Sequence, residues 1–465
     1  MLDKAELLLP AGSLVKLKTA ILYGADAVYA GTPDMCLRAQ SKFSIEELRE
    51  GIDFVHAHSK KIYLTLNLFM HNRDVEKLPS FVATLRELQP DGVLIADPGV
   101  FQYVRENAPE LNLFVSTQAN ICSWAAVKFW QSMGAKLCVL GREVTFEEVK
   151  EIRSKCPDIL LETFMHGAMC MSYSGRCLIS NYLADRSANQ GKCAHCCRWH
   201  YKLHLRIKDG SIKEITIDEK NKDAFEFLLE EDFRPGEYYE VVEDEHGGYM
   251  LNSKDMCLLP RLPDLLSIGL DSLKVEGRNK TEYYAGVVAR AYRKAIDDWY
   301  NDPQQWNWQN YMPELETLQN RGYCLGFHDG KLTNISQNYE YTRTLGDWLF
   351  AGSLVRWDGD DAVFEIRNYI NSGEEFEFLI PQSLDVIKLK LSEFEDAVTG
   401  EITSRVSAGE GKSIRLRPQV WNMPIEQVKK LLPQYVIARK FQPLKGEQGE
   451  MLTRKKDEFS QLCGD

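Results

Sequence analysis

Five of the chain's twelve cysteines lie within 28 residues of one another, in the segment from Leu160 to Tyr201. They are Cys170, Cys177, Cys193, Cys196 and Cys197. The segment begins with an apolar run, Leu160–Phe164, which predicts a buried strand, and the thiols follow shortly after His166 and Gly167. Thiolates that converge beyond the end of a strand can hold a zinc ion or an iron–sulfur cluster.

The spacing of these thiols favours a cluster over a zinc finger. Six residues separate Cys170 from Cys177, and only Cys193 and Cys196 form a Cys-x2-Cys pair. A zinc ribbon has two such pairs, whereas four thiolates that meet at one cluster tolerate irregular spacing. Free cysteines often pack as small apolar side chains, but packing alone does not account for five thiols in so short a stretch. The residues therefore predict an iron–sulfur cluster, with zinc as the alternative.

The elements that must position these thiols are short apolar runs separated by longer amphipathic stretches, such as 14–23 and 43–58. The eight candidate strands are Glu6–Pro10, Ala27–Ala30, Ile62–Leu66, Gly92–Ala96, Leu113–Ser116, Leu137–Leu140, Leu160–Phe164 and Ser272–Val275. Eight strand–helix units predict an α/β protein with a closed (β/α)8, TIM-like barrel. An open doubly wound sheet is the alternative, although no Gly-x-Gly-x-x-Gly motif follows the first strand.

The texture of the sequence predicts the domain organisation. We expect a barrel over 1–300 that carries a cysteine-rich, partly β-structured insertion at about 165–260. Alternating runs between Gly and Asp turns predict a C-terminal all-β small barrel over 325–440. The polar tail, 441–465, is expected to be loosely held. Because eight strands close a barrel without this β domain, a chain that ends near Asn301 is expected to fold.

Chemistry in such a barrel takes place at the carboxyl ends of the strands, which we call the mouth. The polar residues at those ends are Asn67, Asp97, Gln118, Arg142, His166, Glu276 and Arg278, joined by Arg176 from the insertion. We interpret His166 and Glu276 as catalytic candidates, and the set Asn67, Gln118, Arg142, Arg176 and Arg278 as substrate-binding. Arginine binds carboxylates through two parallel hydrogen bonds, so the three arginines predict a dicarboxylate ligand. The alternatives are helix capping for Asp97 and a structural hydrogen bond for His166.

A second set of cations lies in the predicted β domain. Alternation places Lys388 and Lys390 on one face of a strand, and Arg415 and Arg417 on one face of another. We interpret these four residues as RNA-binding, with solvated outer faces of strands as the alternative. The net charge of −12 argues against nonspecific coating of nucleic acid, but it permits one local basic face.

The composition is that of a soluble globular protein, with 44% hydrophobic and 27% charged residues. The first residues show no basic region followed by an apolar one, so we expect no signal peptide. No apolar run reaches the roughly 20 residues that span a bilayer. Twelve cysteines without a secretory signal indicate reduced thiols, so we expect a cytoplasmic protein that does not bind a membrane.

Two motifs, Glu162-Thr-Phe-Met-His-Gly-Ala-Met-Cys170 and Ser174-Gly-Arg-Cys177-Leu-Ile-Ser180, resemble the signature of the collagenase-like peptidase family (peptidase U32 type). Asn189-Gln-Gly-Lys-Cys193, Cys197-Arg-Trp-His-Tyr201 and 321–327 are most similar to its branch of prephenate-dependent tRNA uridine hydroxylases. The resemblance covers nearly the whole chain. It implies a tRNA-modifying enzyme that forms 5-hydroxyuridine at the wobble position.

The resemblance also implies a [4Fe-4S] cluster, for which Cys170, Cys177, Cys193 and Cys197 match the ligands. Cys196 is an extra thiol, and Cys36 lies where one relative with a different ligand set draws a ligand. Cys257 has no near neighbour among the thiols, so it is a weaker ligand candidate that we interpret as structural. The fourth ligand is taken to be Cys197, with Cys36, Cys196 and Cys257 as the alternatives. Prephenate is implied as a co-substrate or precursor, tRNA as the partner, and an electron donor or cluster-assembly proteins as further partners.

Two other functions are weighed against this one. The family name suggests a peptidase, but the chain contains neither His-Glu-x-x-His nor Gly-x-Ser-x-Gly. Some relatives are non-catalytic, cluster-bearing partners of hydroxylation complexes. The additional β domain favours the tRNA enzyme, since a tRNA substrate needs extra binding surface.

Overall fold

The computed structural model describes residues 4–32, 43–68, 70–170, 172–174, 176, 179–184, 196, 253–330, 336, 338, 344–409 and 411–464, together with the backbone of five short strands between 204 and 249. The part of the chain so described contains no helix that is long and apolar enough to cross a membrane.

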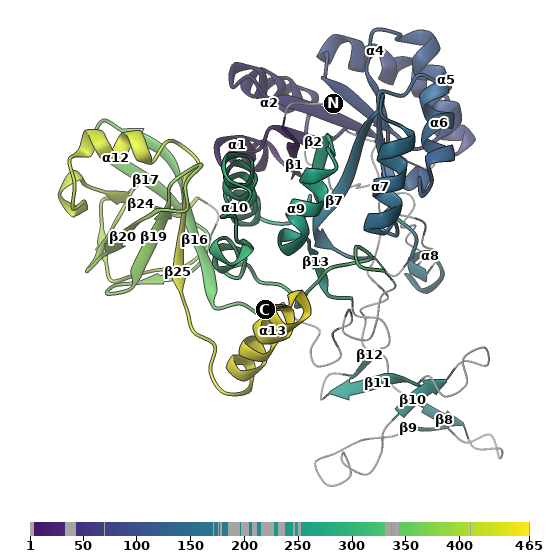
Figure 1. The fold of residues 1–465 in the computed structure, drawn as a ribbon. Coiled ribbons are helices and arrows are strands. Elements are labelled where there is room, and N and C mark those ends of the chain that lie inside the picture. The colour runs from purple at the N-terminus through teal and green to yellow at the C-terminus, as the bar shows by residue number, and fades with distance from the viewer. Residues whose placement is uncertain are drawn as a thin grey trace.

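Eight parallel strands form a closed barrel (Figure 1). They are β1 (Glu6–Ala11), β2 (Ala27–Gly31), β3 (Lys61–Leu66), β4 (Gly92–Ile95), β5 (Leu113–Val115), β6 (Leu137–Val139), β7 (Leu160–Ala168) and β14 (Ser272–Val275). Strand β14 pairs with both β1 and β7, which closes the barrel. The predicted TIM-like barrel and its strand positions are confirmed. The runs are apolar because each strand is covered on both faces.

Helices cover the outside of the barrel. The main ones are α1 (Leu14–Leu22), α2 (Ile45–Ala57), α4 (Leu78–Leu88), α5 (Pro98–Asn107), α6 (Trp124–Ser132), α7 (Phe146–Lys155), α9 (Leu262–Ser267) and α10 (Glu282–Asn301), with short helices α3 (Asn72–Val75) and α8 (Ile179–Ala184). The start of α2 is fixed by a capping box between Ser44 and Glu47, and the start of α7 by one between Thr145 and Glu148. These caps set where each helix begins after its strand.

Two extra strands extend the barrel wall beyond the mouth. Strand β13 (Asp255–Cys257) runs antiparallel to the end of β7, and β15 (Tyr323–Cys324) runs parallel to β13. Between β7 and β13 lies the predicted insertion, which contains β8 (His204–Arg206), β9 (Ile212–Glu214), β10 (Phe227–Glu230), β11 (Tyr238–Asp244) and β12 (Gly247–Tyr249). The β-rich character that the sequence indicates for this segment is confirmed.

The C-terminal region forms an antiparallel sheet of eight strands, in the order β20-β19-β25-β16-β17-β24-β21-β22. These are β16 (Trp348–Asp358), β17 (Asp361–Ile366), β19 (Glu375–Leu379), β20 (Val386–Lys390), β21 (Phe394–Asp396), β22 (Ile402–Thr403), β24 (Ser413–Leu416) and β25 (Ile437–Phe441). Strands β18 (Ile370–Asn371) and β23 (Arg405–Val406) form a separate pair, and α12 (Ile425–Leu431) precedes β25. The predicted all-β region is present, but its sheet begins at Trp348, because β15 belongs to the barrel wall and α11 (Met312–Leu315) packs beside α10.

The prediction of a loosely held tail is wrong. Residues Glu447–Cys463 form helix α13, which lies beside the barrel extension (Figure 1). Its buried residues Leu452, Phe459 and Cys463 recur at helical spacing, and the Phe459 ring packs against Tyr323 with 5.6 Å between centroids. Glu458 forms an ion pair with Lys254 at 2.8 Å. Seven charged residues in the segment obscure this narrow apolar stripe in the sequence.

Candidate functional site

Three of the predicted binding residues come together at the mouth. The Asn67 amide, just after β3, donates to the Ser116 hydroxyl at 3.3 Å and to the Gln118 side-chain oxygen at 3.4 Å. Gln118 belongs to a short 3-10 turn that follows β5, and its carbonyl accepts a hydrogen bond from Arg176 Nε at 3.3 Å. Arg176 therefore reaches from the insertion to the mouth, as the sequence predicts.

The other two arginines lie against aromatic rings that line the barrel. The guanidinium carbon of Arg142 is 3.7 Å from the centre of the Phe164 ring. Arg278 donates to the Thr65 hydroxyl at 3.1 Å and lies 5.7 Å from the centre of the Tyr29 ring. The Nε atom of Arg142 is shielded from solvent and has no hydrogen-bond partner within the described residues. A buried N–H without a partner is costly, so this atom favours an additional acceptor.

Lys274, on strand β14, lies inside the barrel close to the two arginines. Lys274 Nζ is 2.6 Å from Glu162 Oε1 and 4.4 Å from the centre of the Tyr29 ring. Burial lowers the pKa of Lys274; Glu162 opposes this effect, and the positive charges of Arg278 and Arg142 add to it. Three cations thus lie close together near the mouth, and Lys274 is paired with Glu162. The mutual repulsion of these three cations favours an anionic ligand, because a bound anion offsets it.

Lys274 is a functional candidate that the sequence analysis missed. It stands between Leu273 and Val275 in an otherwise apolar strand. A charged residue at an inward position of a barrel strand is the signal that could have identified it.

The prediction that His166 faces the mouth is wrong. The pairing of β7 with β14 shifts between Lys274 and Val275, so that Met165 has no partner and His166 lies opposite Val275. This bulge turns His166 outward, where its Nδ1 is 3.2 Å from the Tyr292 hydroxyl on α10. Burial lowers the pKa of His166 to about 3, so the ring is neutral. The structural hydrogen bond is the interpretation that the contacts support.

Glu276 is half-buried at the end of β14, and its backbone is held firmly. Its N–H donates to the His166 carbonyl at 2.8 Å, and its carbonyl accepts from the Tyr284 hydroxyl at 2.8 Å. Gly167, with φ +119°, lets the chain pass this carbonyl, since a Cβ there would be 2.5 Å from it. A catalytic role for the Glu276 side chain stays a prediction. The Asp97 carboxylate caps α5, as the structural alternative predicts.

The cysteines are described only in part. Cys170, just beyond β7, is exposed, and its sulfur lies 3.3 Å from the Ser172 hydroxyl. Cys177, Cys193, Cys197 and Cys36 are outside the described residues, so the predicted ligand set stays a prediction. Cys196 is buried. An exposed thiol at the end of a barrel strand fits a ligand position better than a packing role, because free cysteines are otherwise mostly buried.

Cys257, on strand β13, is a buried thiol. Burial raises the pKa of the Cys257 thiol to about 12, and its sulfur contacts the Tyr292 hydroxyl at 3.6 Å. A neutral, buried thiol agrees with the structural role that the sequence indicates. Among the residues that the structure describes, no three histidine, cysteine or acidic side chains converge to hold a metal ion.

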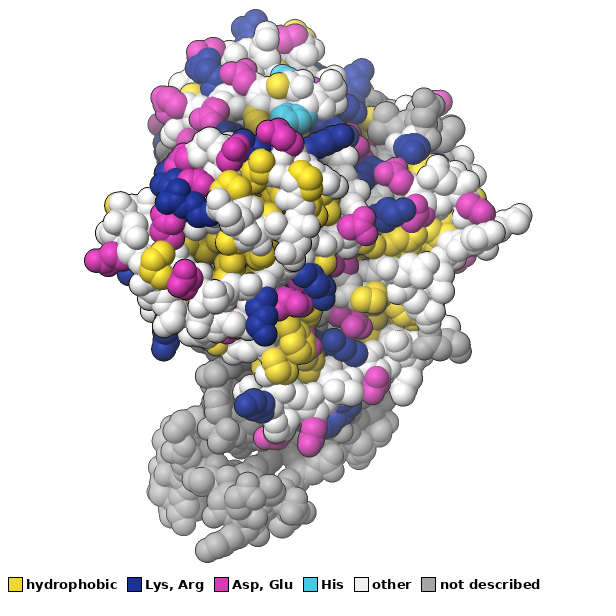
Figure 2. Space-filling model, turned by 90° about the vertical axis from the view of Figure 1, so that its left-hand side faces the viewer, with side chains coloured by type: hydrophobic (Ala, Val, Ile, Leu, Met, Phe, Trp, Pro, Cys, Tyr) yellow, Lys and Arg dark blue, Asp and Glu magenta, His cyan; other side chains and the backbone are white. Residues whose placement is uncertain are grey.

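The four C-terminal cations are mostly engaged by carboxylates. Lys388 lies 3.3 Å from both Glu375 and Glu377. Arg415 and Arg417 share Asp361 and Glu395, with Arg417 at 2.9 and 2.7 Å. Lys388 and Lys390 are exposed on one face of β20, as alternation predicts, but four strands separate β20 from β24 in the sheet. On this side of the molecule, cationic and acidic side chains are interspersed (Figure 2).

Comparisons with known proteins identify relatives of this chain. The model of peptidase family U32 matches residues 12–338. The chain is 40% identical to tRNA hydroxylation protein P of Escherichia coli over 433 residues, which are 89% of this chain and 93% of that protein. It is 34% identical to an uncharacterized protease of Methanocaldococcus jannaschii, over 73% of this chain and 76% of that protein. It is also 30% identical to the 23S rRNA 5-hydroxycytidine C2501 synthase of Escherichia coli, over 63% of this chain and 39% of that protein.

Proposed function

Because the chain belongs to peptidase family U32, we propose that it is an RNA-hydroxylating member of that family and not a protease. Its substrate is tRNA, in which it forms 5-hydroxyuridine at the wobble position. The likeness to tRNA hydroxylation protein P spans most of both chains, which supports this substrate. The likeness to an rRNA 5-hydroxycytidine synthase supports the same class of chemistry on an RNA base.

The single observation that carries the proposal is the cationic group at the mouth. The charges of Arg278 and Arg142 add to the effect of burial on the pKa of Lys274, so the three cations lie close together. The shielded Arg142 Nε has no acceptor in the described part of the chain. A small dicarboxylate such as prephenate fits this group, since each guanidinium can bind one carboxylate by two hydrogen bonds. The rings of Phe164 and Tyr29 hold the arginines in place. Asn67 and Gln118 form the polar rim beside them.

The contacts of His166 weigh against the protease. A cysteine protease needs a histidine that can accept a proton from the thiol. His166 is buried on the helix side of the barrel wall and hydrogen-bonds to Tyr292. At a pKa of about 3 it would be a weak base. The exposed Cys170 thiol contacts Ser172.

We further propose that Cys170, Cys177, Cys193 and Cys197 hold a [4Fe-4S] cluster. The cluster would supply electron transfer to the reaction and would draw its electrons from an external donor. The exposed position of Cys170, just beyond β7, supports this assignment. The chain's own residues bind and orient the ligands. The arginines hold the dicarboxylate, and the C-terminal sheet offers RNA-binding surface outside the mouth.

The test combines nucleoside analysis with metal analysis. Total tRNA from cells that lack this chain should lose 5-hydroxyuridine, and the wild-type chain should restore it. The Cys170→Ala variant should fail to restore it, and protein purified without oxygen should contain iron and sulfide in near-equal amounts. Cys196→Ala is the matched control, which should keep both iron and activity. Unchanged nucleosides in the deletion strain would refute the hydroxylase, and zinc in place of iron would refute the cluster.

A further inference from the structure

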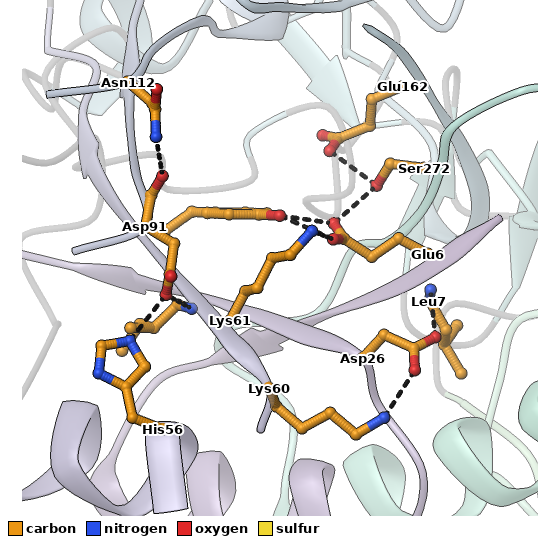
Figure 3. A network of polar contacts seen from close by, with 12 residues as sticks. Glu6, Leu7, Asp26, His56, Lys60, Lys61, Asp91, Asn112, Glu162 and Ser272 are labelled. Carbon is orange, nitrogen blue, oxygen red and sulfur yellow. Dashed lines mark hydrogen bonds and ion pairs between the residues drawn. The ribbon is translucent and has the colours of Figure 1, made fainter. Parts of the chain in front are cut away.

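Two buried carboxylates lie in a row inside the barrel, near the amino-terminal ends of strands β1 and β14. Glu6 exposes 4% of its surface and Glu162 exposes none. Glu6 is opposite Ser272 in the pairing of β1 with β14, and Ser272 is opposite Glu162 in the pairing of β14 with β7. The three side chains therefore come from adjacent strands at one level, and they point toward one another (Figure 3).

The hydrogen bonds in this row have a defined order. The Ser272 hydroxyl is 3.0 Å from Glu162 Oε2 and 3.4 Å from Glu6 Oε1. A hydroxyl carries one proton, so it donates to only one of the two carboxyl groups. The shorter contact identifies Glu162 as its acceptor, and the other Glu162 oxygen accepts from Lys274 at 2.6 Å. The contact between Glu6 and Ser272 is a hydrogen bond only if Glu6 carries a proton and donates it.

The surroundings of Glu6 support a protonated state. Burial raises the pKa of Glu6; Lys61 and the Tyr63 hydroxyl lower it, and the charge of Glu162 raises it. The net direction is upward. The Tyr63 hydroxyl lies 2.9 and 2.8 Å from the two Glu6 oxygens. Burial raises the pKa of Tyr63, and the charges of Glu6, Glu162 and Asp91 add to this effect. Tyr63 therefore stays a donor.

The two ends of the row have different surroundings. At one end, Lys274 lies beneath Arg142 and Arg278 at the mouth, against the ring of Tyr29. At the other end, Lys61 Nζ is 3.1 Å from Glu6 Oε2. Lys61 is the first residue of β3, and 47% of its side chain is exposed. The row thus runs from the mouth to solvent at the amino-terminal end of the barrel.

We propose that Lys274, Glu162, Ser272 and Glu6 form a proton relay between the mouth and solvent at the opposite end of the barrel. This proposal rests on the proposed function only in placing the reacting ligand at the mouth. Lys274 is the catalytic residue, which in this proposal donates its proton to a ligand bound beside Arg142 and Arg278. Glu162, Ser272 and Glu6 are positioning residues that act through it.

The transfers balance. The Lys274 ammonium gives a proton to a basic atom of the ligand and becomes an amine. Glu162 takes the hydroxyl proton of Ser272, and Ser272 takes the carboxyl proton of Glu6. Glu162 then passes its new proton to the Lys274 amine, and Glu6 regains a proton from solvent beside Lys61. All four groups return to their first states, and one proton has moved from solvent to the ligand.

The first test needs no RNA. Infrared spectroscopy of the purified full-length protein at neutral pH should show the carbonyl stretch of a protonated carboxylic acid. Glu6→Gln should remove this band, and Ser272→Ala should shift its frequency because the acid loses its acceptor. The matched control is Glu87→Gln, an exposed glutamate that pairs with Arg49 and should leave the band unchanged. Absence of the band from the wild type, or its persistence in Glu6→Gln, would overturn the relay.

The second test measures turnover. Ser272→Ala should slow tRNA hydroxylation by about 100-fold, which is a typical contribution of proton transfer, and should change its pH profile. The tRNA dissociation constant should stay the same. Ser272→Thr keeps a hydroxyl and should recover most of the rate. A wild-type rate and pH profile in Ser272→Ala would overturn the relay. A wild type that does not hydroxylate tRNA would refute the proposed function, and the infrared result would still decide the relay.

Discussion

The hydroxyl of Tyr23, at the end of α1, accepts a hydrogen bond from the backbone N–H of Ile437 in β25 at 2.9 Å. The same hydroxyl donates to the Leu379 carbonyl in β19 at 2.9 Å. Beside it, Gly286 of α10 lets Ile437 approach, since a Cβ at 286 would be 2.4 Å from Ile437 Cδ1. The C-terminal sheet is therefore joined to the barrel by buried contacts, with Leu379 and Ile437 in the barrel's own core.

Tyr23→Phe should destabilise the protein by about 2 kcal/mol, because it leaves the N–H of Ile437 and the carbonyl of Leu379 buried without a partner. Urea unfolding of the full chain measures this change. Tyr435→Phe is the control, since its hydroxyl is half-buried and contacts Lys18, which also pairs with Glu50. Equal stability of Tyr23→Phe and the wild type would show that the two hydrogen bonds contribute little.

The same contacts correct the expectation that a chain ending near Asn301 folds. Arg290 of α10 has no exposed surface, and its guanidinium donates to the Asp385 carbonyl of the C-terminal region at 3.0 Å. Glu314, which such a truncation removes, pairs with the same Arg290 at 3.7 Å. Truncation would expose Arg290, Tyr23 and the apolar surface around Gly286. Because exposed apolar surface promotes association, we expect a chain that ends near Asn301 to aggregate.

The barrel could be predicted from the sequence because its strands are apolar at successive positions. The sequence places Asn67, Gln118 and Arg278 at the mouth correctly, because each follows the carboxyl end of a strand whose position along the chain is evident. The outward turn of His166 could not be predicted, because it depends on a shift in the pairing of β7 with β14. The ion pairs of Arg415 and Arg417 depend on which strands are neighbours, and that information is tertiary. Lys274 could have been found, but a single charge in an apolar strand was overlooked.

The buried His166 should make stability depend on pH. Its pKa is lowered to about 3 from an ordinary value of 6.5. Between these values the unfolded chain binds a proton that the native state does not, so stability falls as the pH falls below 6.5. His166→Gln removes the group that binds this proton. The free energy of unfolding should therefore fall by about 2 kcal/mol less between pH 7 and pH 5 in this variant than in the wild type. The control is His58→Gln at an exposed position. Parallel stability curves for His166→Gln and the wild type would contradict this assignment.

The arginines at the mouth should be sensitive to replacement by lysine. Arg142→Lys or Arg278→Lys keeps the charge but loses the planar fork that binds a carboxylate. The concentration of dicarboxylate needed for half-maximal activity should rise by about 10- to 100-fold, as expected for a lost hydrogen bond between charged groups. Thermal unfolding and bound iron should not change. Arg49→Lys, in an exposed ion pair with Glu87, is the control and should behave as the wild type. Normal kinetics in both mouth variants would identify the two arginines as structural.

The C-terminal cations should contribute unequally to tRNA binding. Arg415 and Arg417 are held by Asp361 and Glu395, so a phosphate must displace existing ion pairs to reach them. The lysines are more accessible, with 58% of the Lys388 side chain exposed. Each phosphate contact releases counterions, so the loss of two contacts should flatten the slope of log affinity against log salt by about 1.5. We expect this change for the Lys388→Ser, Lys390→Ser double variant, and a smaller one for Arg415→Ser, Arg417→Ser.

Fluorescence anisotropy with labelled tRNA, measured over a series of salt concentrations, checks this order. The two double variants serve as controls for each other, because each removes two charges from the same sheet. The slope of log affinity against log salt could instead flatten more in the arginine variant than in the lysine variant. In that case phosphates displace the carboxylates readily, and the ion pairs do not limit tRNA binding. A fourfold variant combines all four Ser substitutions. If it keeps the tRNA affinity and the salt dependence of the wild type, tRNA is bound elsewhere, and the C-terminal sheet stabilises the barrel through the contacts of Tyr23 and Arg290.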